Sequence, residues 1–142
     1  MKNINFLLLG FIFSGFCHAQ ADINAVIEIN NIVINGGTVH LAVFSSNDSF
    51  KNQTPEYGGD IPALNAAMTF EITLPAGEYV ITAYQDANNN GRIDIGLFGI
   101  PRELVGVSNY FGRGFPSQNF ERQKVKVDST ANRVVLNLYK FF

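Results

Sequence analysis

Cysteine and tryptophan are almost absent from this chain of 142 residues, which contains one cysteine, Cys17, and no tryptophan. Cys17 falls in an apolar N-terminal segment, so the rest of the chain is expected to fold without a disulfide, and it is long enough to do so. Histidine is scarce as well, because His40 is the single histidine beyond residue 21. One imidazole without a cysteine or a second histidine does not complete a transition-metal site of the usual kind.

Other signatures of catalysis and binding are missing too. The net charge of −2 offers no basic surplus for nucleic acid, and no apolar run reaches the roughly 20 residues of a membrane-spanning helix. The chain has no Gly-x-Ser-x-Gly motif, and Gly112 and Gly114 precede no helical pattern that would make a phosphate loop. His40 is expected to be a solvent-facing strand residue. We therefore expect no catalytic residues and no enzymatic activity.

The first 21 residues are predicted to be a secretory signal peptide. Lys2 supplies the basic start, residues 6–16 form a short apolar run, and cleavage is expected after Ala19 or after Ala21. The remaining residues, 22–142, then form a single domain of about 120 residues. The sequence therefore predicts a periplasmic or secreted protein that does not span the membrane.

Alternation of apolar and polar residues dominates the rest of the chain. Phe70 and Leu74 share one side of the segment 69–75, while Glu71 and Thr73 share the other. A period of two residues is typical of a strand with one face on a core. Strands are predicted at 25–34, 38–44, 69–75, 78–86, 124–128 and 133–141. The predicted core residues are Leu41, Val43, Phe70, Ile72, Leu74, Ile81, Leu136 and Leu138.

Turn sequences and two long connections complete the pattern. Residues 35–37, Asn-Gly-Gly, are expected to form a hairpin turn, since Asn and Gly accept positive φ. The connection 45–65 is irregular, and residues 62–68 are expected to form one helical turn. The connection 86–120 is too long for a plain loop and is a candidate for function. The pattern favours an all-β fold, an antiparallel, immunoglobulin-like β-sandwich of about seven strands with this one long irregular loop.

The long loop begins with oxygen-bearing side chains at alternate positions. Asp86, Asn88, Asn90 and Asp94 occupy the first, third, fifth and ninth positions of an EF-hand-type calcium loop, and a glycine occupies the sixth. Arg92, at the seventh position, would contribute its backbone carbonyl oxygen. This spacing predicts a structural calcium site at 86–94, with calcium as the expected cofactor.

Departures from the EF-hand pattern leave a second interpretation open. Leu97 stands at the twelfth position, where an EF-hand has a bidentate glutamate, and the preceding segment is a strand rather than a helix. Glu103 is the residue that could return to supply the missing carboxylate. Asp and Asn also cap ordinary turns with their own side chains. The alternative is therefore a capped turn without calcium.

Residues 75–109 carry a family resemblance. They read Pro-Ala-Gly-Glu-Tyr at 75–79, then the Asp-x-Asn-x-Asn-Gly-x-x-Asp loop, then Gly-Ile-Pro-x-Glu-x-x-Gly-x-Ser-Asn at 99–109. This order resembles the exported bacterial domain-of-unknown-function family DUF2141, over most of the chain beyond residue 21. The resemblance implies an exported protein without an established activity. Family members often have His before the first Asp of the loop, where this chain has Gln85. Further site candidates in this stretch are Glu103, Ser108 and Asn109.

Residues 76–86 also resemble a strand of the transthyretin-like and carboxypeptidase-regulatory sandwiches, which usually serve as binding or stabilising modules. We therefore expect an exported, non-catalytic module with an unidentified protein or glycan partner. One alternative is a small extracytoplasmic hydrolase with its site in the long loop. Another is a carbohydrate-binding module that uses the loop aromatics Tyr110, Phe111 and Phe115.

Overall fold

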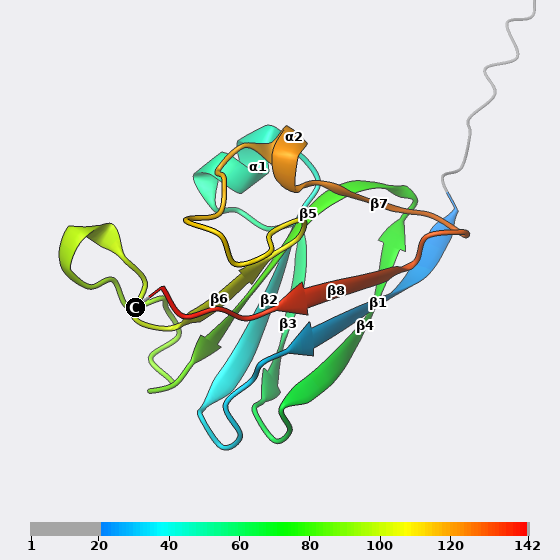
Figure 1. Cartoon of the computed structure of the whole chain (residues 1–142). Coiled ribbons are helices and arrows are strands. Elements are labelled where there is room, and N and C mark those ends of the chain that lie inside the picture. The colour runs from blue at the N-terminus through cyan, green and yellow to red at the C-terminus, as the bar shows by residue number, and fades with distance from the viewer. Residues whose placement is uncertain (1–20, 142) are drawn as a thin grey trace, which may run out of the picture.

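The computed structural model describes residues 21–141 and shows a two-layer β-sandwich (Figure 1). The smaller sheet has the order β4 (Ala67–Pro75), β1 (Asp22–Asn30), β8 (Arg133–Asn137). The larger sheet has the order β3 (Tyr57–Pro62), β2 (Thr38–Phe44), β5 (Gly77–Asp86), β6 (Leu104–Val107), and β7 (Val125–Val127) pairs with the start of β5. The predicted all-β sandwich is confirmed, whereas the predicted signal peptide falls outside the described residues.

Each stretch predicted as a strand overlaps an observed strand, although β1 begins at Asp22 and ends at Asn30, before the predicted end at residue 34. Two further strands lie in the long connections. β3 pairs with β2, and β6 pairs with β5. The sequence of β3, YGGDIP, contains residues that disfavour strands, so its conformation depends on pairing with β2. The connections also contain α1 (Asn47–Asn52), which Ser46 caps, the short 3-10 turn η1 (Leu97–Gly99) and α2 (Phe120–Gln123).

Two predicted turns are wrong. Residues 35–37 are not a hairpin turn, because β1 and β2 belong to different sheets and this segment carries the chain between them. Gly37 permits the crossing, since its φ is 81° and a Cβ there would overlap the carbonyl oxygen of Asp86. Residues 62–68 form no helical turn. The backbone of Ala63 instead bonds to Asn35 and Gly37, which holds the two connections side by side.

One strand pairing also differs from the expected antiparallel arrangement. β8 runs parallel to β1, with Val26 opposite Arg133 and Asn30 opposite Asn137. The reason is the path of the chain: residues 128–132 leave β7 in the larger sheet and cross to β8 in the smaller one. The other strand pairs are antiparallel, as predicted.

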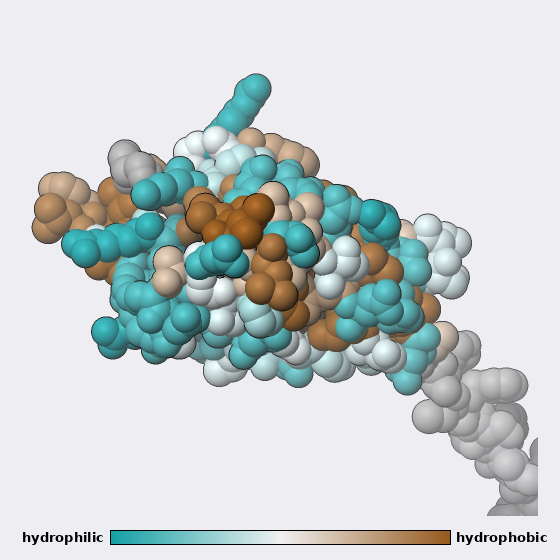
Figure 2. Space-filling model, turned by 90° about the horizontal axis from the view of Figure 1, so that it is seen from below, coloured by the Kyte–Doolittle hydropathy of each residue, from teal (hydrophilic) through white to brown (hydrophobic). Residues whose placement is uncertain are grey.

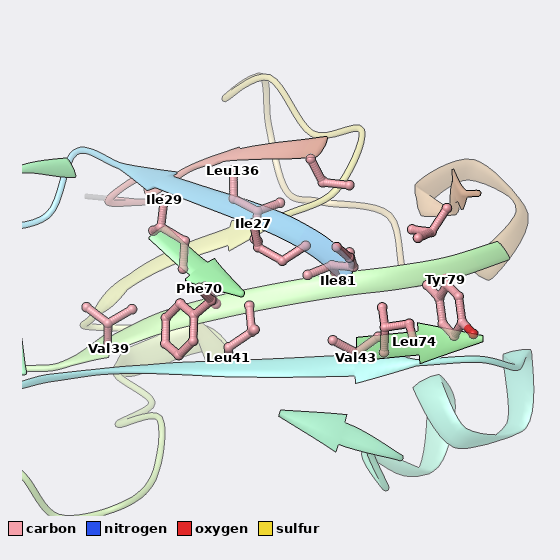
Figure 3. Close-up of a cluster of buried hydrophobic side chains, with 14 of the residues drawn as sticks. Ile27, Ile29, Val39, Leu41, Val43, Phe70, Leu74, Tyr79, Ile81 and Leu136 are labelled. Carbon is pink, nitrogen blue, oxygen red and sulfur yellow. The ribbon is translucent and has the colours of Figure 1, made fainter. Parts of the chain in front are cut away.

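The core lies between the two sheets, where the alternating apolar side chains meet (Figure 3). Seven of the predicted core residues are buried, and Ile72 is half-buried against the same cluster. Glu71 and Thr73 are exposed, so the predicted register of β4 is confirmed. β1 adds Ile27 and Ile29, both fully buried.

The outer face of the larger sheet carries different side chains at its two ends. At one end α1 and α2 enclose a second apolar cluster. Its members are Phe44, Phe50, Val80, Val107 and Phe120. The opposite end of this face carries polar strand residues and the start of the long loop at Asp86, and the candidate site lies there. Among the helices of residues 21–141, none has the length and apolar character to cross a bilayer.

Candidate functional site

The predicted calcium loop starts at the buried end of β5. Asp86 is the last residue of that strand and is fully buried. Its Oδ2 accepts the N–H of Gly91 at 2.6 Å, and its Oδ1 accepts the N–H of Asn90 at 3.2 Å. Burial alone would raise the pKa of Asp86, but these N–H groups and the nearby His40 outweigh it and hold the pKa below its usual value. Asp86 is thus a carboxylate that closes the loop onto the strand.

Three further side chains of the loop converge on one another. The Nδ2 atoms of Asn88 and Asn90 donate to the two oxygens of Asp94, at 2.7 and 2.9 Å. These hydrogen bonds lower the pKa of Asp94, with Asn90 contributing most. The amide oxygens meanwhile accept the N–H groups of Asn90 and Arg92. Rotation of both amides would turn two neutral oxygens towards the carboxylate of Asp94.

The backbone of the loop has the bend that a calcium loop requires. Gly91, at the sixth position, has a φ of 77°, and no atom would obstruct a Cβ there, so its backbone conformation alone favours glycine. Asn89 also has a positive φ, of 56°. Its Oδ1 accepts the hydroxyl of Thr38 at 2.8 Å, which fastens the loop to β2.

Glu103 returns to the loop, as its sequence position suggested. It is 7% exposed, and its Oε2 accepts the N–H of Asp94 at 3.2 Å. The N–H of Arg102 donates to the carbonyl of Asp94 at 2.9 Å, and this hydrogen bond brings the backbone next to Glu103 alongside the loop. The Oε1 atom of Glu103 is buried without a hydrogen-bond partner. Burial, together with the charges of Asp86 and Asp94, raises the pKa of Glu103 despite the N–H groups it accepts.

The other predicted positions of the loop are exposed. Leu97, at the twelfth position of the pattern, is 79% exposed and does not face the loop interior as a ligand would. The side chain of Arg92 lies in solvent with its Nε 3.7 Å from Asp94 Oδ1, which leaves its carbonyl as the candidate ligand. Across residues 21–141, no three His, Cys, Asp or Glu side chains are already arranged around a common metal position. Calcium binding would therefore need the Asn amide oxygens and small rotations of the carboxylates.

His40 belongs to the same end of the sheet, which the sequence did not reveal. The ring faces away from the core, as expected, but its side chain is only 21% exposed and is therefore half-buried rather than free in solvent. The ring stacks on Tyr84 with centroids 4.7 Å apart, and its Nδ1 lies 2.6 Å from Asp60 Oδ1. The buried Nε2 lies 3.5 Å from Asp86 Oδ2 and has no hydrogen-bond partner. Cross-strand pairing creates this group, because β2 places His40 between Asp60 of β3 and Tyr84 of β5.

Two predicted site residues are structural links instead. Ser108 is buried, and its Oγ accepts the N–H of Ile81 at 3.0 Å and donates to the carbonyl of Gln123 at 2.6 Å. The Nδ2 of Asn109 donates to the carbonyl of Lys124 at 2.6 Å. Both side chains thus tie the end of β6 to α2 and the residue after it, away from the calcium loop.

Gln85 is also structural. Its buried side chain bonds to the backbone of Val33 and Gly36. Because side chains alternate along β5, residue 85 and Asp86 face opposite sides of the sheet. A histidine at this position would therefore not face the loop as a ligand.

Replacing Ser108 by alanine should lower the free energy of unfolding by about 1–3 kcal/mol, because the N–H of Ile81 would lose its side-chain acceptor inside the protein. Urea unfolding measures this change. Ser129→Ala, at an exposed turn residue, is the matched control and should have little effect. Equal effects of the two substitutions would contradict the structural role of Ser108.

The loop aromatics do not form one flat platform. Tyr110 is half-buried, packs edge-on against Tyr139 and donates its hydroxyl to the carbonyl of Gly114. Phe115 stacks on Phe141 with ring centroids 5.4 Å apart. Phe111 is 76% exposed. These contacts favour packing as the role of Tyr110, whereas Phe111 and Phe115, which is 61% exposed, keep most of their surface in solvent.

Comparison with known proteins identifies a family without an assigned activity. The sequence model of a family described as an uncharacterized protein conserved in bacteria (DUF2141) matches residues 27–135. The match confirms the resemblance drawn from the loop and its flanking motifs. No curated protein and no solved structure matches the chain.

Proposed function

The chain belongs to the DUF2141 family, and we propose that it is an exported, non-catalytic binding module whose loop 86–94 takes up a calcium ion. Export is supported by the basic, apolar and small-residue order of the first 21 residues. A periplasmic or secreted location supplies the calcium concentrations that weak extracellular sites use.

The observation that carries the calcium proposal is the arrangement around Asp94. The amides at the third and fifth positions meet the carboxylate of Asp94 at the ninth, and Glu103 accepts the N–H of Asp94 through one oxygen while its other oxygen is buried without a partner. An ordinary turn needs only one or two capping side chains. A buried carboxylate oxygen without a partner is costly unless a cation or a proton compensates it.

The electrostatics of the loop favour a dication. Asp86, Asp94 and Glu103 are close enough for the first two to raise the pKa of the third. Two carboxylates and two amides place the affinity in the weak extracellular range, with a dissociation constant on the order of 10⁻⁴–10⁻³ M. The carboxylate of Glu103 strengthens the site relative to the loop alone. The ion would have a structural role and would pin the end of β5 to residues 94–103.

Thermal unfolding of the purified protein in chelator, in excess calcium and in excess magnesium tests the proposal. Calcium at a hundred times the dissociation constant should stabilise the protein by about 2.7 kcal/mol. Magnesium should stabilise it less, since it demands near-ideal octahedral geometry and dehydrates reluctantly. Equal unfolding temperatures in chelator, calcium and magnesium would contradict the proposal and support the alternative, a capped turn without calcium.

Glu103→Gln should reduce the calcium-dependent rise in the melting temperature while leaving the protein at least as stable as the wild type in chelator. The amide removes a buried negative charge, which is unfavourable without the ion and favourable with it. Glu71→Gln, at an exposed position of the other sheet, is the matched control and should leave both values unchanged. A full calcium response in Glu103→Gln would show that this carboxylate is not a ligand.

The hydrolase alternative has one observation in its favour, the buried Nε2 of His40 beside Asp86. The contacts of this ring are two carboxylates and an aromatic face, which position an imidazole but provide no nucleophile. Measurable ester or amide hydrolysis that disappears in His40→Ala would favour the alternative over the binding module.

A further inference from the structure

A short loop next to the proposed calcium site presents apolar side chains to solvent. Ile95, Leu97 and Phe98, called the apolar tip here, are 56%, 79% and 95% exposed. The loop projects from the sandwich at the left of Figure 1, and hydrophobic atoms protrude at the same edge of the molecule in Figure 2. Single exposed apolar residues are common, but adjacent ones at a projecting tip mark interaction sites.

The apolar tip has a defined backbone. The N–H of Gly96 bonds to the carbonyl of Ile100 at 2.7 Å, and Ile95 forms a β-bridge with Pro101. Phe98 has a φ of 62°, which is an outlier for a bulky side chain. Such strain tends to persist at functional sites, where the surrounding structure enforces it. Here the bridged loop holds the ring outward.

Two cations share a hollow with the apolar tip. Arg102 and Lys140, together with Leu97 and Phe98, line an open hollow of about 610 Å³. No acidic residue lines this hollow, and neither cation forms an ion pair with another residue of 21–141. The side chain of Arg102 lies against Gly96, so its position is set by the loop itself.

The protein has a second group of exposed apolar side chains, which differs from the apolar tip because no basic residue lies in its connections. Val33, Ile34 and Leu64 are 58%, 54% and 60% exposed at the end of the sandwich. The connections that carry them, 31–37 and 62–66, contain no Lys or Arg. Both groups therefore have more than half of each apolar side chain exposed, but only the tip has basic residues beside it.

We propose that the apolar tip docks on an anionic lipid bilayer, with Leu97 and Phe98 entering the headgroup–acyl boundary and Arg102 and Lys140 binding headgroup phosphates. Apolar and aromatic side chains beside basic ones are the pattern of interfacial membrane binding. The tip also presents only three exposed apolar side chains, whereas a stable protein interface buries about 800 Å² on each partner. The proposal names a partner for the binding module proposed above and rests on that role, but it does not require calcium.

Co-sedimentation of the purified protein with vesicles tests this docking. One set of vesicles contains equal parts of phosphatidylcholine and phosphatidylglycerol, and the other contains phosphatidylcholine alone. We expect binding to the anionic set only. Arg102→Gln with Lys140→Gln should weaken binding roughly tenfold or more, since each basic residue near an anionic surface contributes about fivefold.

The double variant Leu97→Ser with Phe98→Asn tests the apolar part, and it should abolish sedimentation. Asn accepts a positive φ more readily than Phe, so this variant keeps the loop conformation. Ile34→Ser with Leu64→Ser removes two exposed apolar side chains that have no basic residue in their connections, and it should bind like the wild type. Equal binding to both vesicle sets, wild-type binding by the tip variant, or an equal loss in the control variant would overturn the proposal.

Repeating the assay in chelator separates this proposal from the calcium site. Vesicle binding could persist in chelator while the melting temperature of the protein does not change with calcium. This result would support lipid docking and exclude the calcium proposal. A calcium-dependent melting temperature with no vesicle binding, either in calcium or in chelator, would support the calcium site and exclude lipid docking. Sedimentation that inorganic phosphate abolishes as fully as the tip substitutions would also overturn docking, because a free phosphate site does not need Leu97 or Phe98.

Discussion

Replacing Leu74 by alanine is expected to lower the free energy of unfolding by about 2–5 kcal/mol, the usual range for truncating a buried leucine. Leu74 is fully buried and lies opposite Ile23 of β1. Its side chain belongs to the cluster between the two sheets, together with Val43 and Tyr79 (Figure 3). Because both sheets are hydrogen-bonded across their strands, they cannot close around the cavity completely, and the loss should lie well above that of a surface substitution.

Thr73→Ala is the matched control for Leu74→Ala. Thr73 is the preceding residue of β4 and is exposed, so its truncation should change the free energy of unfolding little. Urea unfolding of both variants and the wild type measures the difference, with an unchanged denaturant slope as evidence of the same unfolding transition. Equal losses in the two variants would mean that β4 is shifted by one residue, because such a shift exchanges its two faces.

The faces of the central strands could be predicted from the sequence because one side of each strand is apolar. The alternation of Phe70, Leu74, Glu71 and Thr73 was sufficient for β4. Connections between strands could not be predicted in the same way. The Asn-Gly-Gly segment at 35–37 is compatible both with a hairpin and with a crossing between sheets, and the contact of Gly37 with the backbone of Asp86, which accompanies the crossing, is distant in sequence.

The two missed strands have a related explanation. β3 contains two glycines and a proline, and β6 has only four residues. The composition of β3 disfavours a strand, and β6, although rich in valine, is too short and is interrupted by Gly106. Their conformation comes from pairing with β2 and β5, which are distant in sequence, so local patterns carry no signal for them.

The residues of the candidate site also differ in whether they are close in sequence or are brought together by strand pairing. Asp86, Asn88, Asn90 and Asp94 lie within nine residues, and their alternate spacing was readable directly. His40 was missed because it reaches Asp86 only through the pairing of β2 with β5. Ser108 was misassigned for the opposite reason. A polar residue in a long loop suggests a site, but its burial against Ile81 and Gln123 gives it a structural role.

Asp86→Ala is expected to abolish the calcium-dependent rise in melting temperature and also to lower the melting temperature in chelator. The first effect follows because Asp86 is the first ligand of the proposed site. The second follows because its two oxygens accept the N–H groups of Asn90 and Gly91, which would then lose their partners. Asp86→Asn separates the two effects, since the amide keeps one acceptor oxygen but loses the charge. Asp86→Asn should therefore lose most of the calcium-dependent rise, and its melting temperature in chelator should fall less than that of Asp86→Ala.

Asp128 provides the matched control for this experiment, because it is a turn-capping aspartate outside the proposed calcium site. Its Oδ1 accepts the N–H groups of Thr130 and Ala131, much as Asp86 accepts those of its own loop. Asp128→Ala should lower the melting temperature equally in chelator and in calcium and leave the difference between them intact. If Asp86→Ala behaves in the same way, so that the calcium increment survives it, Asp86 caps the loop without binding calcium. If only Asp86→Ala removes the increment, calcium binding at 86–94 is the explanation that remains, since both substitutions remove a turn cap of the same kind.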